Sequence, residues 1–331
     1  MMAVWTERSE NHGFSYGCTQ GTKAQGRRRR VFFMLSFPGG FMSSYSLVLV
    51  VLAAVIHASW NLLAKRAAQV GAAFVCAYTA FACLFYGPWV CWIIWQGALR
   101  WDWAVAACIV LSGLLHLGYS LCLQRGYQVS DLSIVYPVAR GTGPAVATIG
   151  GVWLMGEGAG ITTWMGLAAV VLGIALISSR GRIDAHAQRP LFTGIRWGVA
   201  TGLFIAGYSI VDAFGVKGLA IAPVVLDWSA NVVRLGMLLP WIASNPQQAV
   251  CSMRGFWVLA MLVGALSPLS YILVLTALDM GAALSVVAPV REMSMMIAAL
   301  LAIIILREPL SVGRLAGCVV LSAGVVILVV L

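Results

Sequence analysis

The chain has 331 residues, of which 61% are hydrophobic and only 10% are charged. Because soluble domains carry about 25% charged residues, this composition excludes a soluble globular protein and predicts an integral membrane protein. The net charge of +10 does not indicate nucleic-acid binding, since no soluble domain is long enough to carry such a site and many basic residues lie at the start of the chain.

Residues 1–41 are polar and basic, and Arg27–Arg30 precede an apolar run that is too short to span a bilayer. The layout is not that of a signal peptide, because no adequate apolar region and cleavage site precede the first long apolar segment. We expect a disordered cytosolic leader, or a true start at Met42.

Ten apolar segments follow, and each is about 20 residues long, which is enough to cross a hydrocarbon core about 30 Å thick. They are predicted near 44–64, 72–95, 103–124, 132–155, 160–179, 191–214, 222–243, 255–277, 284–306 and 310–330. Tryptophans gather at membrane–water interfaces. Five of them surround residues 96–103, so we expect a helix boundary near residue 97.

The chain repeats itself when it is shifted by about 151 residues. The matched pairs include Arg140 with Arg291, Glu157 with Glu308, Gly166 with Gly317, and Gly173 with Gly324. Each repeat holds five segments, over residues 42–180 and 191–331, and an odd number gives the second copy the opposite orientation. The sequence therefore predicts an all-α integral membrane fold of ten transmembrane helices, arranged as two inverted five-helix repeats.

Five motifs, HASWNLLAKR (57–66), PVARG (137–141), MGEG (155–158), APVRE (288–292) and LREPL (306–310), resemble the EamA-type group of the drug/metabolite transporter superfamily. The resemblance covers about residues 44–331. It implies a central cavity lined by the first, third and fourth helices of each half, and transport of small metabolites, often export of amino acids. It also implies a bacterial-type inner membrane and cytoplasmic termini, although the basic residues of the loops favour the opposite orientation.

Arg140, Arg291 and Glu292 are ionisable residues predicted at membrane depth, where such residues usually mark a pathway. Two arginines suit a carboxylate or phosphate, because the planar guanidinium binds either group in a bidentate manner. Alternatively, they only pair with Glu292 or with free backbone carbonyls. Glu292 in turn is either a group that binds a substrate ammonium or exchanges a proton, or a fixed counter-ion.

Proline removes a helix hydrogen bond, and weakened backbone at this depth is tolerated where it lines a cavity. We therefore expect the helices to be interrupted around four residues: Pro137, Gly141, Pro144 and Pro289. Six further residues are candidates for substrate contact, because the repeat pairs them across the two halves: His57 with Tyr208, Asn61 with Asp212, and Tyr119 with Tyr271. For His57, a buried packing role is an equal alternative.

Several polar residues are expected to be structural rather than to bind substrate. Asp227, Asn231 and Arg234 share one helix face without a counterpart in the first half, which favours contacts between helices. Trp60 and His116 are expected to pack, and Glu157 and Glu308 to cap or lie at an interface. The paired glycines of the fifth and tenth helices are expected to let these helices pack closely.

These patterns predict a secondary transporter that works by alternating access around a midplane cavity, and the family resemblance implies an exporter of amino acids or similar metabolites. A proton is a candidate coupling ion, and the expected partners are a small-molecule substrate and the lipid bilayer. A membrane channel and a sensor or scaffold are the alternatives. We expect no enzyme, no cofactor and no metal, because no catalytic motif, cofactor loop or zinc-like Cys/His spacing is present. A monomer and a homodimer remain equally open.

Overall fold

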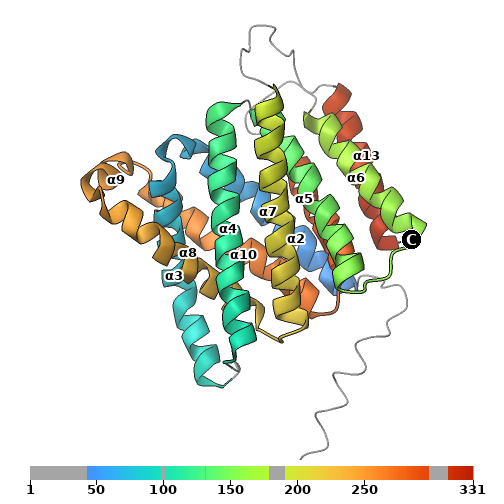
Figure 1. The fold of residues 1–331 in the computed structure, drawn as a ribbon. Helices are drawn as coiled ribbons and strands as arrows, with labels where there is room; N and C mark the ends of the chain where they lie inside the picture. Colours follow the sequence, from blue (N-terminus) through green and yellow to red (C-terminus); the bar gives the residue numbers. More distant parts are fainter. Residues whose placement is uncertain (1–42, 98–100, 131, 179–190, 298–311, 331) are drawn as a thin grey trace, which may run out of the picture. The chain divides into compact units, whose positions relative to one another are not determined.

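The computed structural model describes residues 43–97, 101–130, 132–178, 191–297 and 312–330 (Figure 1). Within these ranges every regular element is a helix and no strand occurs, which confirms the all-α class. The α-helices are α2 (Ser44–Arg66), α3 (Ala72–Trp95), α4 (Trp103–Val129), α5 (Leu132–Leu154), α6 (Ile161–Ser178), α7 (Leu191–Lys217), α8 (Pro223–Ala243), α9 (Pro246–Ser252), α10 (Trp257–Asp279), α11 (Leu284–Arg291) and α13 (Val312–Val330), with a 3₁₀ turn η2 (Ala68–Val70).

Six of the described helices, α2, α3, α4, α6, α7 and α10, are long and apolar enough to cross a membrane. This confirms an integral membrane protein. The other long helices contain buried charge or are shorter: α5 contains Arg140, and α8 contains Asp227 and Arg234. The second half of the ninth predicted segment, Glu308 and the leader 1–41 lie outside the described residues. The short helix α9 was not predicted.

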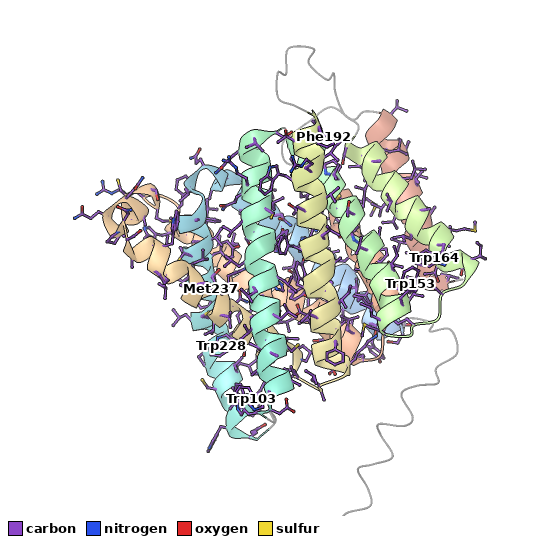
Figure 2. The ribbon with its side chains drawn as sticks, viewed as in Figure 1. Trp103, Trp153, Trp164, Phe192, Trp228 and Met237 are labelled. Atoms are coloured by element: carbon purple, nitrogen blue, oxygen red, sulfur yellow. The ribbon has the colours of Figure 1, made fainter. Side chains whose placement is uncertain are left out.

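The turn between α3 and α4 lies where the tryptophan cluster predicts a boundary. Gly97 has a φ of +73°, a left-handed conformation that glycine adopts without a steric penalty, and it follows the last residues of α3. Asp102 then caps α4, because its side chain accepts a 2.8 Å hydrogen bond from the amide of Val105. Trp95 and Trp103 beside this turn are 86% and 91% exposed. Figure 2 shows Trp103 at one end of the helices and Phe192 at the other.

The helices pack mainly across the two halves of the sequence rather than within each half. α2 packs on α10 and α7 on α4, while α3 contacts both α8 and α10, and α8 contacts both α3 and α4. α5 packs on α7 and α11, and α6 lies along α13 (Figure 1). All these helices belong to one compact unit, so neither predicted repeat forms a separate core.

Glycines bring α6 and α13 into backbone contact, as the paired glycines predict. A methyl group added to Gly173 would lie 2.7 Å from the amide nitrogen of Leu321, and one added to Gly317 would lie 2.6 Å from that of Ile177. Gly166 and Gly324 face each other in the same way. Close packing of small residues stabilises helix pairs in lipid, where no hydrophobic effect drives association.

The predicted interruption of the helix at Pro137, Gly141 and Pro144 is not found, since α5 continues through all three. Each proline removes only one hydrogen bond of the helix, and tight packing against α7 supports the remainder: a methyl group on Gly143 would lie 2.8 Å from Ile205. The helix that contains Pro289 behaves differently. α11 ends two residues after that proline, at Arg291.

Glu292 forms the turn after α11. Its amide donates to the carbonyl of Pro289 at 3.0 Å, its carbonyl accepts from the amide of Met295 at 2.9 Å, and residues 293–297 are helical again. Both hydrogen bonds join residues three positions apart, as in a 3₁₀ turn, so the backbone is wound more tightly here than in an α-helix. The break therefore lies at the acidic residue that the sequence singles out.

Candidate functional site

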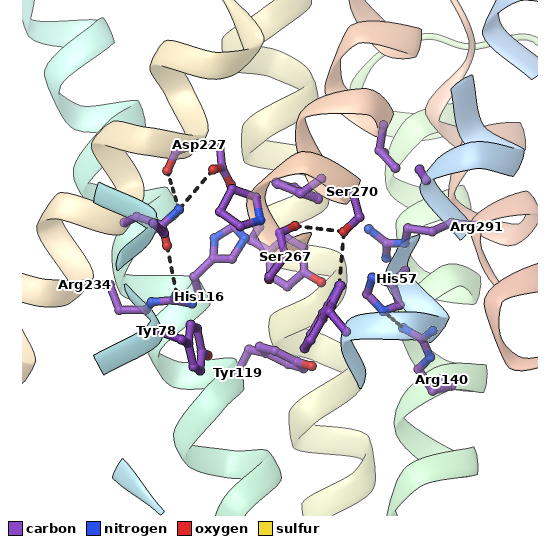
Figure 3. Close-up of a pocket in the computed structure, with 18 residues that line it drawn as sticks. His57, Tyr78, His116, Tyr119, Arg140, Asp227, Arg234, Ser267, Ser270 and Arg291 are labelled. Carbon is purple, nitrogen blue, oxygen red and sulfur yellow. Dashed lines mark hydrogen bonds between the residues drawn. The ribbon is translucent and has the colours of Figure 1, made fainter. Parts of the chain in front are cut away.

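A cavity of about 80 Å³ lies among α2, α3, α4, α5, α7, α8, α10 and α11 (Figure 3). Its polar lining side chains are those of His57, Trp60, Tyr78, His116, Tyr119, Arg140, Tyr208, Asp227, Asn231, Arg234, Ser267, Ser270, Tyr271 and Arg291. Small-molecule sites usually enclose roughly 300–1,000 Å³. In this conformation the cavity is therefore too small to enclose most metabolites.

Arg140 is held at one end of the cavity by three partners. Its Nε lies 2.8 Å from Oε2 of Glu292, its Nη2 donates to the hydroxyl of Ser294 at 2.7 Å, and its Nη1 lies 3.4 Å from Nε2 of His57. Glu292 is fully buried and does not line the cavity. In this conformation it lies behind the arginine as a counter-ion.

Arg291 lies at the same end but is held much less tightly (Figure 3). Its Nε is 3.9 Å from Oε1 of Glu292, too far for a hydrogen bond. Its Nε and Nη2 are buried and have no hydrogen-bond partner among the described residues. Arg291 also lines a second hollow of about 10 Å³ that extends towards Leu284 and the start of α11.

Figure 3 shows a second polar group at the opposite end of the cavity, on α8. Asn231 donates to a carboxylate oxygen of Asp227 at 3.0 Å, and Arg234 donates to both Asn231 and Thr79 at 2.8 Å. These contacts join α8 to α3, as the sequence predicts. However, the cavity is also lined by Asp227, Asn231 and Arg234. The contacts between helices that the sequence favoured therefore do not exclude a position where these residues can contact a substrate.

Aromatic rings form the wall between the two polar ends. His116 stacks on Tyr208 with ring centroids 4.0 Å apart, and Tyr271 and Tyr119 meet Tyr208 edge-on at 5.8 Å and 5.9 Å. Trp60 donates through Nε1 to the hydroxyl of Ser270 at 3.2 Å. Such rings offer apolar surface with a polar edge, which suits a ligand that carries both kinds of group.

Six of the nine residues predicted to contact substrate line the cavity: His57, Tyr119, Arg140, Tyr208, Tyr271 and Arg291. The other three do not. Asn61 donates to the backbone carbonyl of His57 at 2.9 Å on its own helix, and Asp212 and Glu292 lie behind the cavity wall. Asn61 does not reach the cavity because its side chain binds the carbonyl four residues earlier, an acceptor that lies close to it on the same helix.

Sequence reasoning did not predict that Tyr78, Ser267 and Ser270 line the cavity, and it assigned Trp60 and His116 to packing. A serine or tyrosine in an apolar helix gives no signal of the direction in which it points. The described residues contain no group of three His, Cys, Asp or Glu side chains that could hold a metal ion.

Glu157 caps the helix that carries Arg291. Its Oε1 accepts from the amide of Leu284 at 2.7 Å and from Nζ of Lys217 at 3.1 Å, and its Oε2 accepts from the amide of Ser285 at 2.8 Å. A carboxylate at a helix N-terminus satisfies free amide groups and complements the helix dipole. The predicted capping role of Glu157 is confirmed, and it ties the loop between α5 and α6 to α11.

Comparison with known proteins shows what the chain is similar to. Residues 44–179 match the EamA-like transporter family. The resemblance predicted from the sequence is confirmed over this part of the chain. A comparison with curated proteins gives no match.

Among solved structures, 29 chains match this chain. One of them, titled "Crystal structure of protein", has a TM-score of 0.67 and 14% sequence identity, and the alignment covers 86% of this chain and 96% of that one. At this identity the likeness shows the fold alone. The family match indicates a membrane transporter, and the chemistry of the cavity has to be argued from its residues.

Proposed function

We propose that the chain is a secondary transporter for a small metabolite with an anionic group, most plausibly an amino acid, and that Arg291 is the principal residue that binds this group. The observation that carries the proposal is the guanidinium of Arg291, which is buried, lines the cavity and leaves two nitrogens without a partner. A buried charged donor without a partner is costly. A carboxylate would accept two parallel hydrogen bonds from it and remove that cost.

The charges around the cavity favour this end for an anion. Arg140 and Arg291 face a single carboxylate, Glu292, so one positive charge is left over when all three are ionised. Arg140 already has close partners, whereas Arg291 does not. Glu292 acts as the fixed counter-ion of this pair.

The other end of the cavity suits the amino group of a zwitterion. Asp227 is the one carboxylate among the described residues that line the cavity. Glu292, which the sequence offers as an alternative, lies behind Arg140 in this conformation. We therefore assign the ammonium to Asp227.

Alternating access between two inverted repeats, 42–180 and 191–331, is part of the proposal. In the predicted repeat, α2, α3 and α4 of the first half correspond to α7, α8 and α10 of the second half. The contact of α2 with α10 therefore corresponds to that of α7 with α4, and the contact of α3 with α10 corresponds to that of α8 with α4. All four contacts occur. The pairs α3–α8, α5–α11 and α6–α13 map onto themselves. This pattern is the one that a two-fold axis relating the halves would generate, and it supports rocking of the halves around the cavity. Such a motion would also enlarge the small cavity.

We further propose export across a bacterial-type inner membrane with cytoplasmic termini, by a monomer or a homodimer, and without catalysis. A channel would need a continuous open path, whereas the cavity is small and the N-terminus of α11 is tied down by Glu157. A sensor or scaffold would not need a buried arginine without a partner.

Counterflow in proteoliposomes tests the proposal. Purified protein is reconstituted with one unlabelled amino acid inside and the same labelled amino acid outside, over a panel of acidic, neutral and basic side chains. A transporter gives a transient accumulation of label, a channel gives only equilibration, and a scaffold gives neither. We expect Arg291→Ala to abolish the accumulation and Arg291→Lys to weaken it, whereas the exposed Arg254→Ala is the matched control and keeps it. Counterflow that is unchanged in Arg291→Ala would refute the assignment.

A further inference from the structure

We propose that Asp212, on α7, is a proton-binding site that communicates with the cavity through Tyr271 and His116. As a coupling site, this role rests on the transport function proposed above. The hydroxyl of Tyr271 donates to Oδ2 of Asp212 at 2.6 Å, and Nε2 of His116 lies 4.0 Å from the same oxygen. Tyr271 and His116 both line the cavity, while Asp212 lies behind them and is 1% exposed.

The carboxylate of Asp212 lacks the partners that a buried negative charge needs. Among the described residues, no Arg or Lys forms an ion pair with it, and its Oδ1 has no hydrogen-bond partner. Removing an ion from water without a close opposite charge costs several kcal/mol. Binding a proton removes that charge, so this site has a physical reason to change its protonation.

His116 is held in an orientation that can receive or return the proton. Its Nδ1 lies 3.0 Å from the backbone carbonyl of Ser112. A carbonyl oxygen only accepts, so Nδ1 is the donor and carries hydrogen. Nε2, which faces Asp212, is therefore the nitrogen that is free to change its proton. Asp212 and His116 form a pair that is neutral when it holds one exchangeable proton and negative when it holds none.

The groups that interact electrostatically with Asp212 come from several neighbouring helices. They are Cys108, Ser112 and His116 on α4, Tyr208 on its own helix, Asp227 on α8, Tyr271 on α10 and Arg291 on α11. Of these, Tyr271 and His116 lie within 4.0 Å of its carboxylate. α5 meets α7 through glycines such as Gly143 and Gly150. Only Arg291 in this set carries a permanent positive charge. Because Arg291 is also the proposed anion-binding residue, a substrate carboxylate would compete with Asp212 for its field.

The other two buried acids are less suitable. Neither carboxylate oxygen of Glu292 has a hydrogen-bond partner among the described residues. However, Nε of Arg140 at 2.8 Å and Nε of Arg291 at 3.9 Å place two positive charges beside Glu292, so its negative charge is compensated. Asp227 accepts from Asn231, which in turn accepts from Arg234. Among the described residues, Glu292 forms ion pairs with arginines and Asp212 forms none with Arg or Lys, which assigns the exchangeable proton to Asp212 rather than to Glu292.

The exchange itself is simple. A hydronium ion in the cavity gives a proton to the carboxylate of Asp212, which becomes a carboxylic acid. The bond that breaks is an O–H bond of the hydronium ion, which becomes water. When a substrate anion occupies Arg291, its field no longer stabilises ionised Asp212, so substrate and proton should bind together on this reasoning. Because the two then move in the same direction, an inward proton gradient opposes the proposed export, and net export requires an outward substrate gradient that exceeds the proton gradient.

Difference infrared spectroscopy of the reconstituted, substrate-free protein tests the site without knowledge of the substrate. The measured signal is the carbonyl stretch of a protonated carboxyl group that grows as pH is lowered. We expect Asp212→Asn to remove this band and Tyr271→Phe to shift it to higher frequency, because the carbonyl loses its hydrogen-bond donor. Asp227→Asn and Glu292→Gln are the matched controls and should retain it. Loss of the band in Glu292→Gln or Asp227→Asn, with retention in Asp212→Asn, would overturn the assignment.

A transport measurement separates this inference from the proposed function. With an amino acid that shows counterflow in the wild type, Asp212→Asn should keep counterflow but lose accumulation driven by a pH gradient. Accumulation that persists in Asp212→Asn contradicts the proton site and leaves the transporter intact. If no amino acid shows counterflow, the proposed substrate fails, and the infrared titration still decides whether Asp212 binds the proton.

Discussion

Replacing Gly317 by alanine should loosen the contact between α6 and α13. The added methyl carbon would lie 2.6 Å from the amide nitrogen of Ile177 and 2.8 Å from the carbonyl of Gly173, and ordinary contact begins at 3.4 Å. Because both neighbours are backbone atoms, no side-chain rotation relieves the clash, and the helices must separate by about 0.8 Å. A gap of 0.5–1 Å forfeits roughly a quarter to a half of the dispersion energy of the atoms on its two sides.

We therefore expect Gly317→Ala to lower the free energy of unfolding by about 1–3 kcal/mol, the usual range for overpacking. Titration with a denaturing detergent in mixed micelles, followed by tryptophan fluorescence, measures the loss. The matched control is Gly236→Ala on α8, where a methyl group meets nothing within 4 Å. There alanine should be neutral, or stabilising by up to about 1 kcal/mol through helix propensity. Equal stability of the two variants would refute the close packing of α6 on α13.

Three further predictions concern the site and the leader. Glu157→Gln leaves one acceptor oxygen for the amides of Leu284 and Ser285, which costs about 1–3 kcal/mol. The hydrogen exchange of these amides should therefore accelerate at least about fivefold, whereas Lys217→Met should change it less; unchanged exchange would contradict the cap. Arg140→Lys keeps the charge but cannot reach Glu292 and Ser294 together, so the apparent affinity in counterflow should fall about tenfold or more; unaltered affinity would remove Arg140 from the site. Deleting residues 1–41 should leave counterflow intact, and a loss of transport in a stable truncated protein would show that the leader is required.

Much of the fold follows from the sequence because a bilayer admits few solutions. Backbone groups in lipid must be satisfied within a helix, so apolar length alone predicts where helices begin, and each described long helix begins within two residues of its predicted position. Gly173 and Gly317 were likewise predictable, because in an uncharged helix a spaced glycine has little use other than close packing. The capping role of Glu157 follows from a carboxylate in a loop, although its partner on α11 does not.

The sequence alone predicted that Arg140, Arg291 and Glu292 lie at membrane depth, because their neighbours in the chain are apolar. Only the tertiary structure decided how they differ: Arg140 has close partners, Arg291 lines the cavity with unpaired nitrogens, and Glu292 lies behind them. It also placed His116 beside Asp212 and brought Arg234 into the cavity. The physical reason is that chain position sets the depth of a residue along a helix, whereas its partners depend on how each helix is rotated against neighbours from the other half of the sequence.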